Sequence, residues 1–294
     1  MKEAVRRNCP GCDSRRFKVL GSKNGFEVLN CSDCRTLYTA ELPEAGQKED
    51  YDNYYSDENL NVPEFVIRRV GEIVEEFEPY RKTNKLLDIG FGAGTVLETA
   101  AKRGWQVAGL EVSQPAIEQA RRKGFEVFQG FLNDANYPSG QFDVVTASEI
   151  LEHLESPKDD LAEIARILRP GGLLWATTPS ARGISPRMLG IDWSVMAPPE
   201  HTQLYSIRGL RGLLKEAGFD VAKILTHGTN PFEIMHHFQN GRSSQSTGAK
   251  VETSYSLNEK FTSSPSRTLV KSLINLTLNF TGLGDSIKIY AVKR

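Results

Sequence analysis

The glycine run, residues 86–94 (Leu-Leu-Asp-Ile-Gly-Phe-Gly-Ala-Gly), constrains the fold of this chain more than any other segment. A short apolar stretch leads into it and predicts a buried strand that ends at Ile89. Gly90, Gly92 and Gly94 then allow the backbone to turn sharply and to approach a ligand without a Cβ in the way. We therefore expect a strand, a tight turn and a helix, which is typical of a nucleotide-binding α/β domain.

Strand-like and helix-like segments alternate along the rest of the chain. Strands are expected at residues 85–89, 106–111, 125–129, 142–148, 173–177, 219–226 and 286–292, and helices at 62–80, 94–103, 114–123, 161–168 and 210–217. This alternation, with short loops, predicts the α/β class and a doubly wound, seven-stranded, mostly parallel sheet. Ligands of such sheets bind at the carboxyl ends of the strands.

The composition excludes several other classes of protein. With 294 residues, 39% hydrophobic residues, 25% charged residues and a net charge of −1, the chain is typical of a globular protein with one large domain and small additions. It has no apolar stretch of about 18 residues, so we expect no transmembrane helix. No apolar run follows the basic residues at the N-terminus, so we expect no signal peptide and a cytoplasmic location.

The four cysteines form two Cys-x-x-Cys pairs, Cys9 with Cys12 and Cys31 with Cys34, separated by eighteen residues. Two such turns can supply a closed tetrahedral Zn²⁺ site, and four thiolates leave no ligand position open for catalysis. The alternatives are two disulfides, which a reducing cytoplasm disfavours, or metal-free thiols. We therefore interpret residues 1–40 as a structural zinc ribbon. Its basic residues are sparsely interleaved with aromatic ones, so nucleic-acid binding is not expected.

An acidic residue ends each of the first two strands of the core. Asp88 stands where it can take a cationic amino group, and Glu111 stands where a carboxylate can accept both hydroxyls of a ribose. NAD and S-adenosylmethionine both carry a ribose. The spacing Gly-x-Gly-x-Gly, rather than the Gly-x-Gly-x-x-Gly of dinucleotide sites, favours S-adenosylmethionine.

The sequence resembles the class I S-adenosylmethionine-dependent methyltransferases, specifically the branch that includes the ubiquinone-pathway O-methyltransferases. The matching motifs are the glycine run, Glu111, Phe142-Asp143-Val144-Val145, Glu149-Ile150-Leu151-Glu152-His153-Leu154, Leu168-Arg169-Pro170-Gly171-Gly172, Glu200-His201 and Ala217-Gly218-Phe219. A CxxC…CxxC ribbon also precedes this domain in bacterial relatives. The resemblance implies a Rossmann-like fold, S-adenosylmethionine as the cofactor and methyl transfer as the activity.

The same resemblance implies a set of cofactor-binding residues. They are Asp88, Gly90, Phe91, Gly92, Gly94, Glu111, Val112, Phe131 and Glu149. The family often has Gly-Asp after the third strand, with the Asp reaching the adenine, whereas this chain has Gly130-Phe131. Either Phe131 packs on the adenine ring or Asp134 replaces the missing acid.

Glu149, Glu152, His153 and His201 are the candidate catalytic residues. If the first three lie on a helix, their spacing puts them on one face. His153 suits a general base that takes a proton from an attacking hydroxyl. A divalent cation such as Mg²⁺ at Glu149, Glu152 and His153, with His201 beside them, is a second interpretation. The third is that these residues only orient the cofactor and the loop, since positioning can supply much of the rate of methyl transfer.

The remaining segments complete the domain organisation. Residues 41–80 are expected to form an acidic lid or linker and a leading helix, and residues 81–227 with 284–294 form the methyltransferase core. Residues 228–283 are interpreted as an insertion or cap. Within this cap, residues 266–280 carry apolar side chains at helical spacing, which is compatible with docking on the sheet, covering a substrate, pairing with another subunit or resting on a membrane surface.

These observations predict an O-methyltransferase that acts on a small molecule or a glycan. The amphipathic helix and the excess of basic residues over 240–294 suggest a membrane-associated or lipid-linked glycan as the acceptor. The alternative is a zinc-ribbon binding or regulatory protein whose methyltransferase-like domain is not catalytic. The intact glycine run and Glu111 argue against that alternative.

Overall fold

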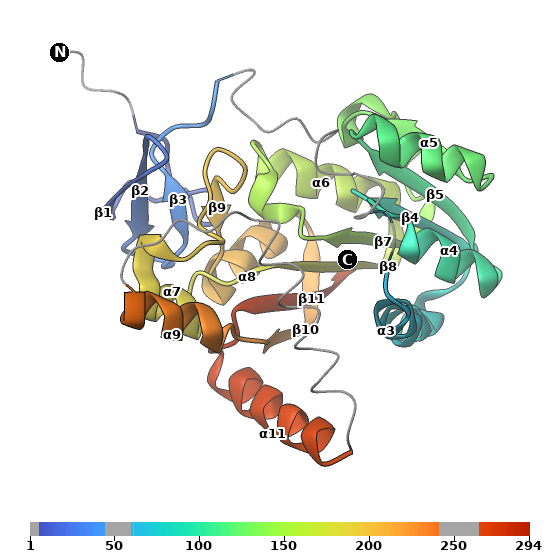
Figure 1. Cartoon of the computed structure of the whole chain (residues 1–294). Helices are drawn as coiled ribbons and strands as arrows, with labels where there is room; N and C mark the ends of the chain where they lie inside the picture. The colour runs from blue at the N-terminus through green and yellow to red at the C-terminus, as the bar shows by residue number, and fades with distance from the viewer. Residues whose placement is uncertain (1–5, 45–59, 61, 241–264) are drawn as a thin grey trace.

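The computed structural model describes residues 6–44, 60, 62–240 and 265–294, and its larger sheet forms the centre of the molecule (Figure 1). The strands of this sheet are β4 (Lys85–Ile89), β5 (Gln106–Glu111), β6 (Glu126–Gln129), β7 (Phe142–Ser148), β8 (Leu168–Pro179), β10 (Phe219–His227) and β11 (Ser286–Lys293). Among these described strands the order is β10-β11-β8-β7-β4-β5-β6, and β11 runs antiparallel to both its neighbours. The predicted seven-stranded, mostly parallel sheet is confirmed.

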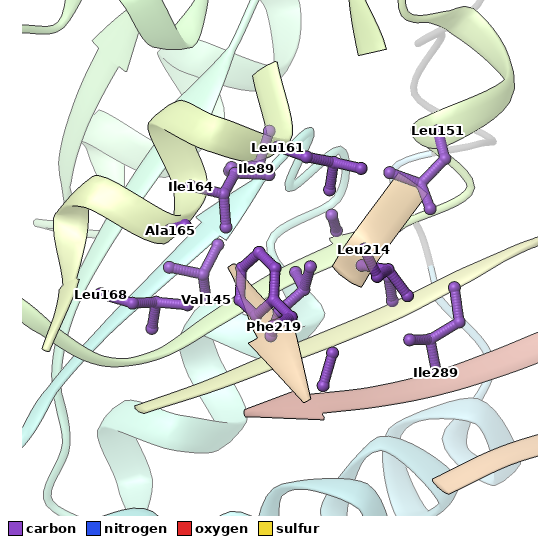
Figure 2. Close-up of a cluster of buried hydrophobic side chains, with 14 of the residues drawn as sticks. Ile89, Val145, Leu151, Leu161, Ile164, Ala165, Leu168, Leu214, Phe219 and Ile289 are labelled. Atoms are coloured by element: carbon purple, nitrogen blue, oxygen red, sulfur yellow. The ribbon is translucent and has the colours of Figure 1, made fainter. Parts of the chain in front are cut away.

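Helices cover both faces of the larger sheet (Figure 1). They are α3 (Glu64–Glu75), α4 (Thr95–Lys102) and α5 (Gln114–Arg122) on one face, and α6 (Pro157–Ile167) and α8 (Ile207–Glu216) on the other. Neighbouring residues of a strand pack on opposite faces of the sheet. Leu86 packs under α3 and α4, whereas Leu87 packs under α6 and α8. Figure 2 shows the second of these clusters around Phe219. Burial on both faces explains why the strands are continuous apolar runs.

A second, four-stranded sheet contains the cysteine-rich segment. Its strands are β1 (Phe17–Lys23), β2 (Phe26–Cys31), β3 (Leu37–Thr39) and β9 (Gln203–Leu204), in that order. An antiparallel hairpin of β1 and β2 lies between the two cysteine pairs. The pairing of β3 with β9 was not predicted, and it joins the N-terminal segment to the chain that follows β8.

Three segments differ from the sequence-based expectations. The leading helix is shorter than 62–80, because α3 ends at Glu75 and a separate 3₁₀ turn, η1 (Glu78–Tyr80), follows. The stretch 169–172, expected to be a loop after α6, belongs to β8, which enters the sheet with an irregular register beside β7. The insertion contains a helix, α9 (Pro231–Asn240), that was not predicted. The acidic stretch 45–59 and the polar stretch 241–264 lie outside the described residues.

The amphipathic helix predicted at 266–280 is present as α11 (Pro265–Thr281). It docks on the end of β10: Leu278 is buried, and the side-chain oxygens of Asn275 and Asn279 accept hydrogen bonds from the backbone N–H groups of Gly228 and Thr226. Among the described helices, none is both long and apolar enough to cross a membrane.

Candidate cofactor and acceptor site

The glycine run turns between β4 and α4 in a conformation that requires glycine. Gly90, Gly92 and Gly94 have φ values of 66°, 50° and 76°, in the left-handed region that other residues rarely adopt. A Cβ on Gly90 would lie 2.2 Å from Cδ1 of Ile150. Phe91 belongs to the turn only through its backbone, because its side chain is buried with α4 and α5. The turn therefore offers backbone atoms to a ligand at the carboxyl edge of the sheet.

Glu111, at the end of β5, is buried and holds the glycine turn in place. Its Oε2 accepts a hydrogen bond from the N–H of Gly92 at 3.0 Å, and its Oε1 accepts from the N–H groups of Val112 at 2.7 Å and Ser113 at 3.2 Å. A carboxylate offers about four acceptor positions, so three donors leave one for a ligand hydroxyl. Ser113 contributes a buried hydroxyl that has no hydrogen-bond partner among the described residues.

Asp88 lies on the neighbouring strand β4, and its side chain is 3% exposed. Its Oδ1 accepts a hydrogen bond of 2.6 Å from the hydroxyl of Thr146 on β7. Burial raises the pKa of Asp88 to about 7, and the nearby negative charge of Glu111 adds to the increase. A cationic ligand group beside Asp88 would stabilise the ionised carboxylate and would therefore oppose this increase in pKa.

The end of β6 supplies the residues that were expected to flank an adenine. Phe131 follows Gly130 directly and is 69% exposed, an unusual position for a large aromatic side chain. Asp134 lies in the next 3₁₀ turn, η2 (Leu132–Asp134). The Gly130 N–H donates to the backbone carbonyl of Glu111. This hydrogen bond holds the residue before Phe131 against the end of β5.

The segment after β7 carries two carboxyl groups that interact with each other, Glu149 and Glu152. The condition that these residues lie on a helix is not met: Glu149 has a left-handed backbone with φ 53°, and a single 3₁₀ turn, η3 (Leu151–His153), follows. Glu152 is fully buried, its Oε2 accepts from the Thr178 hydroxyl at 2.9 Å, and its Oε1 has no hydrogen-bond partner among the described residues. Burial and the charge of Glu149 raise the pKa of Glu152 well above its ordinary value. The residue Glu149 is exposed as a whole, but burial around its carboxyl group raises the pKa of that group.

His153 and His201 face each other across this site. Their ring centroids are 4.6 Å apart with an interplanar angle of 77°. The Nδ1 of His153 lies 3.0 Å from the carbonyl oxygen of Glu200, and that of His201 lies 2.7 Å from the carbonyl oxygen of Val195. A carbonyl can only accept, so in each neutral ring Nδ1 carries the proton and Nε2 carries the lone pair.

The structure brings together a different set of metal-capable residues from the one expected. Ligand atoms of Glu152, His153 and His201 lie within 4.8 Å of one another, whereas Glu149 is not part of this group. Glu149 and Glu152 still influence each other electrostatically. The unpartnered Oε1 of Glu152 and two imidazole nitrogens are donors that suit a divalent cation or a shared proton.

The four cysteines also converge. Their sulfur atoms all lie within 4.8 Å of one another, and the closest pairs, Cys9 with Cys34 and Cys12 with Cys31, are 3.5 Å apart. This separation is too long for a disulfide, and it is close to the value of about 3.8 Å expected for two thiolates on one tetrahedral zinc ion. The thiol groups are therefore positioned to bind zinc.

The cysteine-rich segment packs directly on the chain that carries His201. The Arg7 guanidinium donates to the carbonyl oxygens of Thr39 and Thr202, and the Thr39 N–H donates to the same Thr202 carbonyl. The Thr202 N–H in turn donates to the carbonyl oxygen of Glu152. The ribbon and the group formed by Glu152, His153 and His201 thus share one hydrogen-bonded segment, residues 201–204.

Close packing on α8 completes this contact. A Cβ on Gly209 would lie 2.5 Å from the hydroxyl of Thr36 and 3.3 Å from the sulfur of Cys34, so only glycine allows the ribbon to approach this helix. The Ser206 hydroxyl accepts from the Gly209 N–H and donates to the carbonyl oxygen of Cys34. The Ser206 side chain therefore both caps α8 and binds the backbone of Cys34.

Sequence reasoning missed several residues that support the site. Thr146 orients Asp88, Thr178 binds Glu152, and the Gln203 amide donates to the carbonyl oxygens of Leu151 and Leu154. Thr146 could have been identified, because a polar residue inside the apolar run 142–147 requires a buried partner. Gln203 gave no such signal, because its partners lie far away along the chain.

Comparison with known proteins agrees with this geometry. Residues 62–224 match the family described as a methyltransferase domain. The chain is 28% identical over 168 residues to the ubiquinone biosynthesis O-methyltransferase of Thiobacillus denitrificans, an alignment that covers 53% of this chain and 72% of that protein. It is 30% identical over 171 residues to the protein of the same name from Aromatoleum aromaticum, with the same coverage of 53% and 72%.

Solved structures support the fold. The chain resembles an S-adenosylmethionine-dependent methyltransferase from Archaeoglobus fulgidus with a TM-score of 0.55 and 18% identity, over 83% of this chain and 100% of that one. It also resembles a phosphoethanolamine N-methyltransferase from Haemonchus contortus, with a TM-score of 0.51 and 18% identity, over 77% of this chain and 52% of that one. Both structures are only 18% identical to this chain, so this likeness concerns the fold alone.

Proposed function

Because the chain belongs to the methyltransferase-domain family and is a class I S-adenosylmethionine-dependent methyltransferase, we propose that it methylates an oxygen atom of a small molecule or a glycan. The pair of buried carboxyl groups, Asp88 and Glu111, at the ends of adjacent parallel strands carries the cofactor part of this proposal. The two curated O-methyltransferases that match the core support oxygen as the acceptor atom.

Each end of the cofactor has a proposed partner in the described residues. The carboxyl of Asp88 would bind the cationic amino group, and the remaining acceptor position of Glu111 would bind a ribose hydroxyl. The exposed Phe131 ring would cover the adenine, with Val112 beside it. When bound, S-adenosylmethionine would supply a methyl group on a positively charged sulfur. The acceptor oxygen would form the new O–CH₃ bond as the S–CH₃ bond breaks in line, and S-adenosylhomocysteine would leave.

His153 is the proposed proton acceptor for the hydroxyl that is methylated. The bond between its Nδ1 and the Glu200 carbonyl holds the ring so that Nε2 carries the lone pair. His201 and Glu149 would position the acceptor. The competing role is a divalent cation bound by Glu152, His153 and His201, which would ionise the acceptor oxygen instead.

The affinity for S-adenosylmethionine is expected to rise with pH between about 6.0 and 7.5. The pKa of Asp88 is about 7 without ligand, and binding a cationic amino group requires the ionised form, so binding releases a proton. Below pH 7 the affinity should fall by up to about tenfold per pH unit, and it should level off above the pKa. Titration calorimetry at several pH values measures this slope. Asp88→Asn is the control and should bind weakly with no slope; a flat wild-type profile contradicts the role of Asp88.

Removal of the His153 ring is expected to lower kcat by about 100-fold, the usual contribution of a general base. Treatment with a chelator that leaves the ribbon zinc in place should not change the wild-type kcat. His237→Ala, which removes a partly buried histidine on α9, is the matched control and should retain full activity.

Other outcomes would assign a different role to Glu152, His153 and His201. If chelation abolishes activity and Mg²⁺ restores it, Glu152, His153 and His201 hold a cation, and the base role of His153 is wrong. If neither chelation nor His153→Ala changes kcat, the cluster is structural.

The acceptor class is testable with labelled cofactor and a panel of phenols, sugars and lipid-linked glycans, scored by transfer of the methyl label. We expect the label to appear on an oxygen atom of one class of acceptor, and we expect Asp88→Asn to abolish this transfer. Label only on nitrogen acceptors contradicts O-methylation. Tight cofactor binding with no transfer to any class favours the alternative of a binding or regulatory protein.

A further inference from the structure

A surface pocket of about 370 Å³ lies where the ribbon meets the larger domain, away from the residues assigned to methyl transfer. Its walls come from the loop after Cys34, the segment around α7 (Ile184–Leu189), the start of α8 and the end of α11. Four arginines line it: Arg35, Arg182, Arg187 and Arg208. Segments distant in the sequence thus concentrate positive charge in one concave place.

Among the described residues the four arginines form no ion pair, and Arg187 donates to the backbone carbonyl of Arg182. Asp33 also lines the pocket and its negative charge acts on Arg208, but its carboxylate is bound to Ser14 and Arg16. Partial burial and repulsion from Arg187 and Arg35 lower the pKa of Arg182. The pocket therefore keeps an uncompensated charge that an anion would stabilise.

The backbone at Arg35 gives an independent argument. Six described residues other than glycine have positive φ values, and four of them are Asn or Asp, which tolerate this conformation. Arg35, with φ 70°, is one of the two exceptions, and the other is Glu149 in the acceptor site. A glycine at this position would avoid the strain, so the arginine side chain is retained at an energetic cost.

We propose that this pocket binds a phosphate group of an anionic ligand. Guanidinium groups are planar and present paired N–H donors that match phosphate oxygens, and arginines on three different segments can surround one phosphate. The pocket also includes the first residues of α8, whose N-terminal dipole favours negative charge. The proposal does not depend on the role of any residue in methyl transfer.

The neighbouring surface indicates which phosphates to test. The last residues of α11 border the pocket, and on this helix Leu276 and Phe280 are 65% and 92% exposed. A phosphate with an apolar tail and a free phosphate share the chemistry of the pocket, and they differ in whether these side chains become covered. The membrane contact predicted for 266–280 would place a lipid phosphate here.

The test uses the full chain with its metal and titrates it with inorganic phosphate at constant ionic strength. Arg35→Gln combined with Arg208→Gln removes two exposed arginines of the pocket, and Arg121→Gln combined with Arg122→Gln removes two exposed arginines of α5. Wild type and the α5 variant are expected to bind phosphate with the same Kd. The pocket variant should bind at least about tenfold more weakly, because two charge-assisted contacts are lost.

Sedimentation with phosphatidylcholine vesicles, with and without phosphatidic acid, identifies the source of the phosphate. Binding that requires phosphatidic acid and is lost in the pocket variant assigns the pocket to a lipid headgroup, whereas phosphate binding without vesicle binding assigns it to a soluble phosphate ester. The proposal is wrong if wild type shows no saturable phosphate binding, or if both double variants lose affinity equally.

Discussion

Glu111→Ala is expected to weaken S-adenosylmethionine binding by at least about 100-fold. A hydrogen bond from a ribose hydroxyl to the one remaining acceptor position of this carboxylate contributes about 1.5–3 kcal/mol, and this variant loses it. It also leaves the N–H groups of Gly92, Val112 and Ser113 without their acceptor, so the glycine turn loses its attachment to β5. Titration calorimetry measures the affinity, and thermal unfolding shows whether the chain remains folded.

Two further variants separate binding from folding. Glu126→Ala removes an exposed acid from the neighbouring strand β6 and should leave the affinity unchanged. Glu111→Gln keeps one acceptor oxygen for the turn, but its amide NH₂ faces an N–H donor on the other side. Its unfolding temperature should therefore lie between those of wild type and Glu111→Ala, and it should bind weakly. An affinity of Glu111→Ala within about threefold of wild type would mean that the ribose lies elsewhere.

Cys31→Ser is expected to reduce the zinc content from one ion per chain and to unfold the ribbon. Binding of a structural zinc contributes about 10 kcal/mol or more to folding of such small segments, which are too short to form a core of their own. The effect should extend to the acceptor site, because β3 pairs with β9 and Thr202 binds the backbone of Glu152. We expect kcat to fall at least about tenfold while cofactor affinity changes little.

Metal analysis, hydrogen exchange and initial rates test this expectation together. In Cys31→Ser, backbone amide hydrogens of residues 17–40 and 201–206 should exchange faster than in wild type, whereas those of β4 and β5 should not. Ser32→Ala, which alters the half-buried neighbour of Cys31, is the control and should retain zinc and activity. Full activity in a zinc-free Cys31→Ser protein would separate the ribbon from the active site.

The larger sheet could be predicted because its signals are local. The central strands β4, β7 and β8 contain apolar runs, and the glycine run marks where the first strand must turn. The cysteine spacing likewise predicted a cluster that the structure contains. These signals depend on residues close together in the sequence, where chain geometry leaves few alternatives.

The missed features depend on contacts between distant segments. The strands β3 and β9 are too short to show a periodic pattern, so their pairing had no local signal. His201 meets Glu152 and His153 only because the chain after β8 returns across the end of the sheet. The left-handed backbone of Glu149 breaks the helix on which it would have shared a face with Glu152.

The pairing of β3 with β9 also has a consequence for the order of events during synthesis. The ribbon is made before the larger sheet, yet the strand that completes the ribbon's own sheet, Gln203–Leu204, is made only after most of the larger sheet. Until then β3 presents an unpaired edge, which is a site for association with other nascent chains. Early metal capture by the four thiols would shorten the time that the rest of the ribbon is unfolded, but the edge itself is closed only by the arrival of the segment that carries His201.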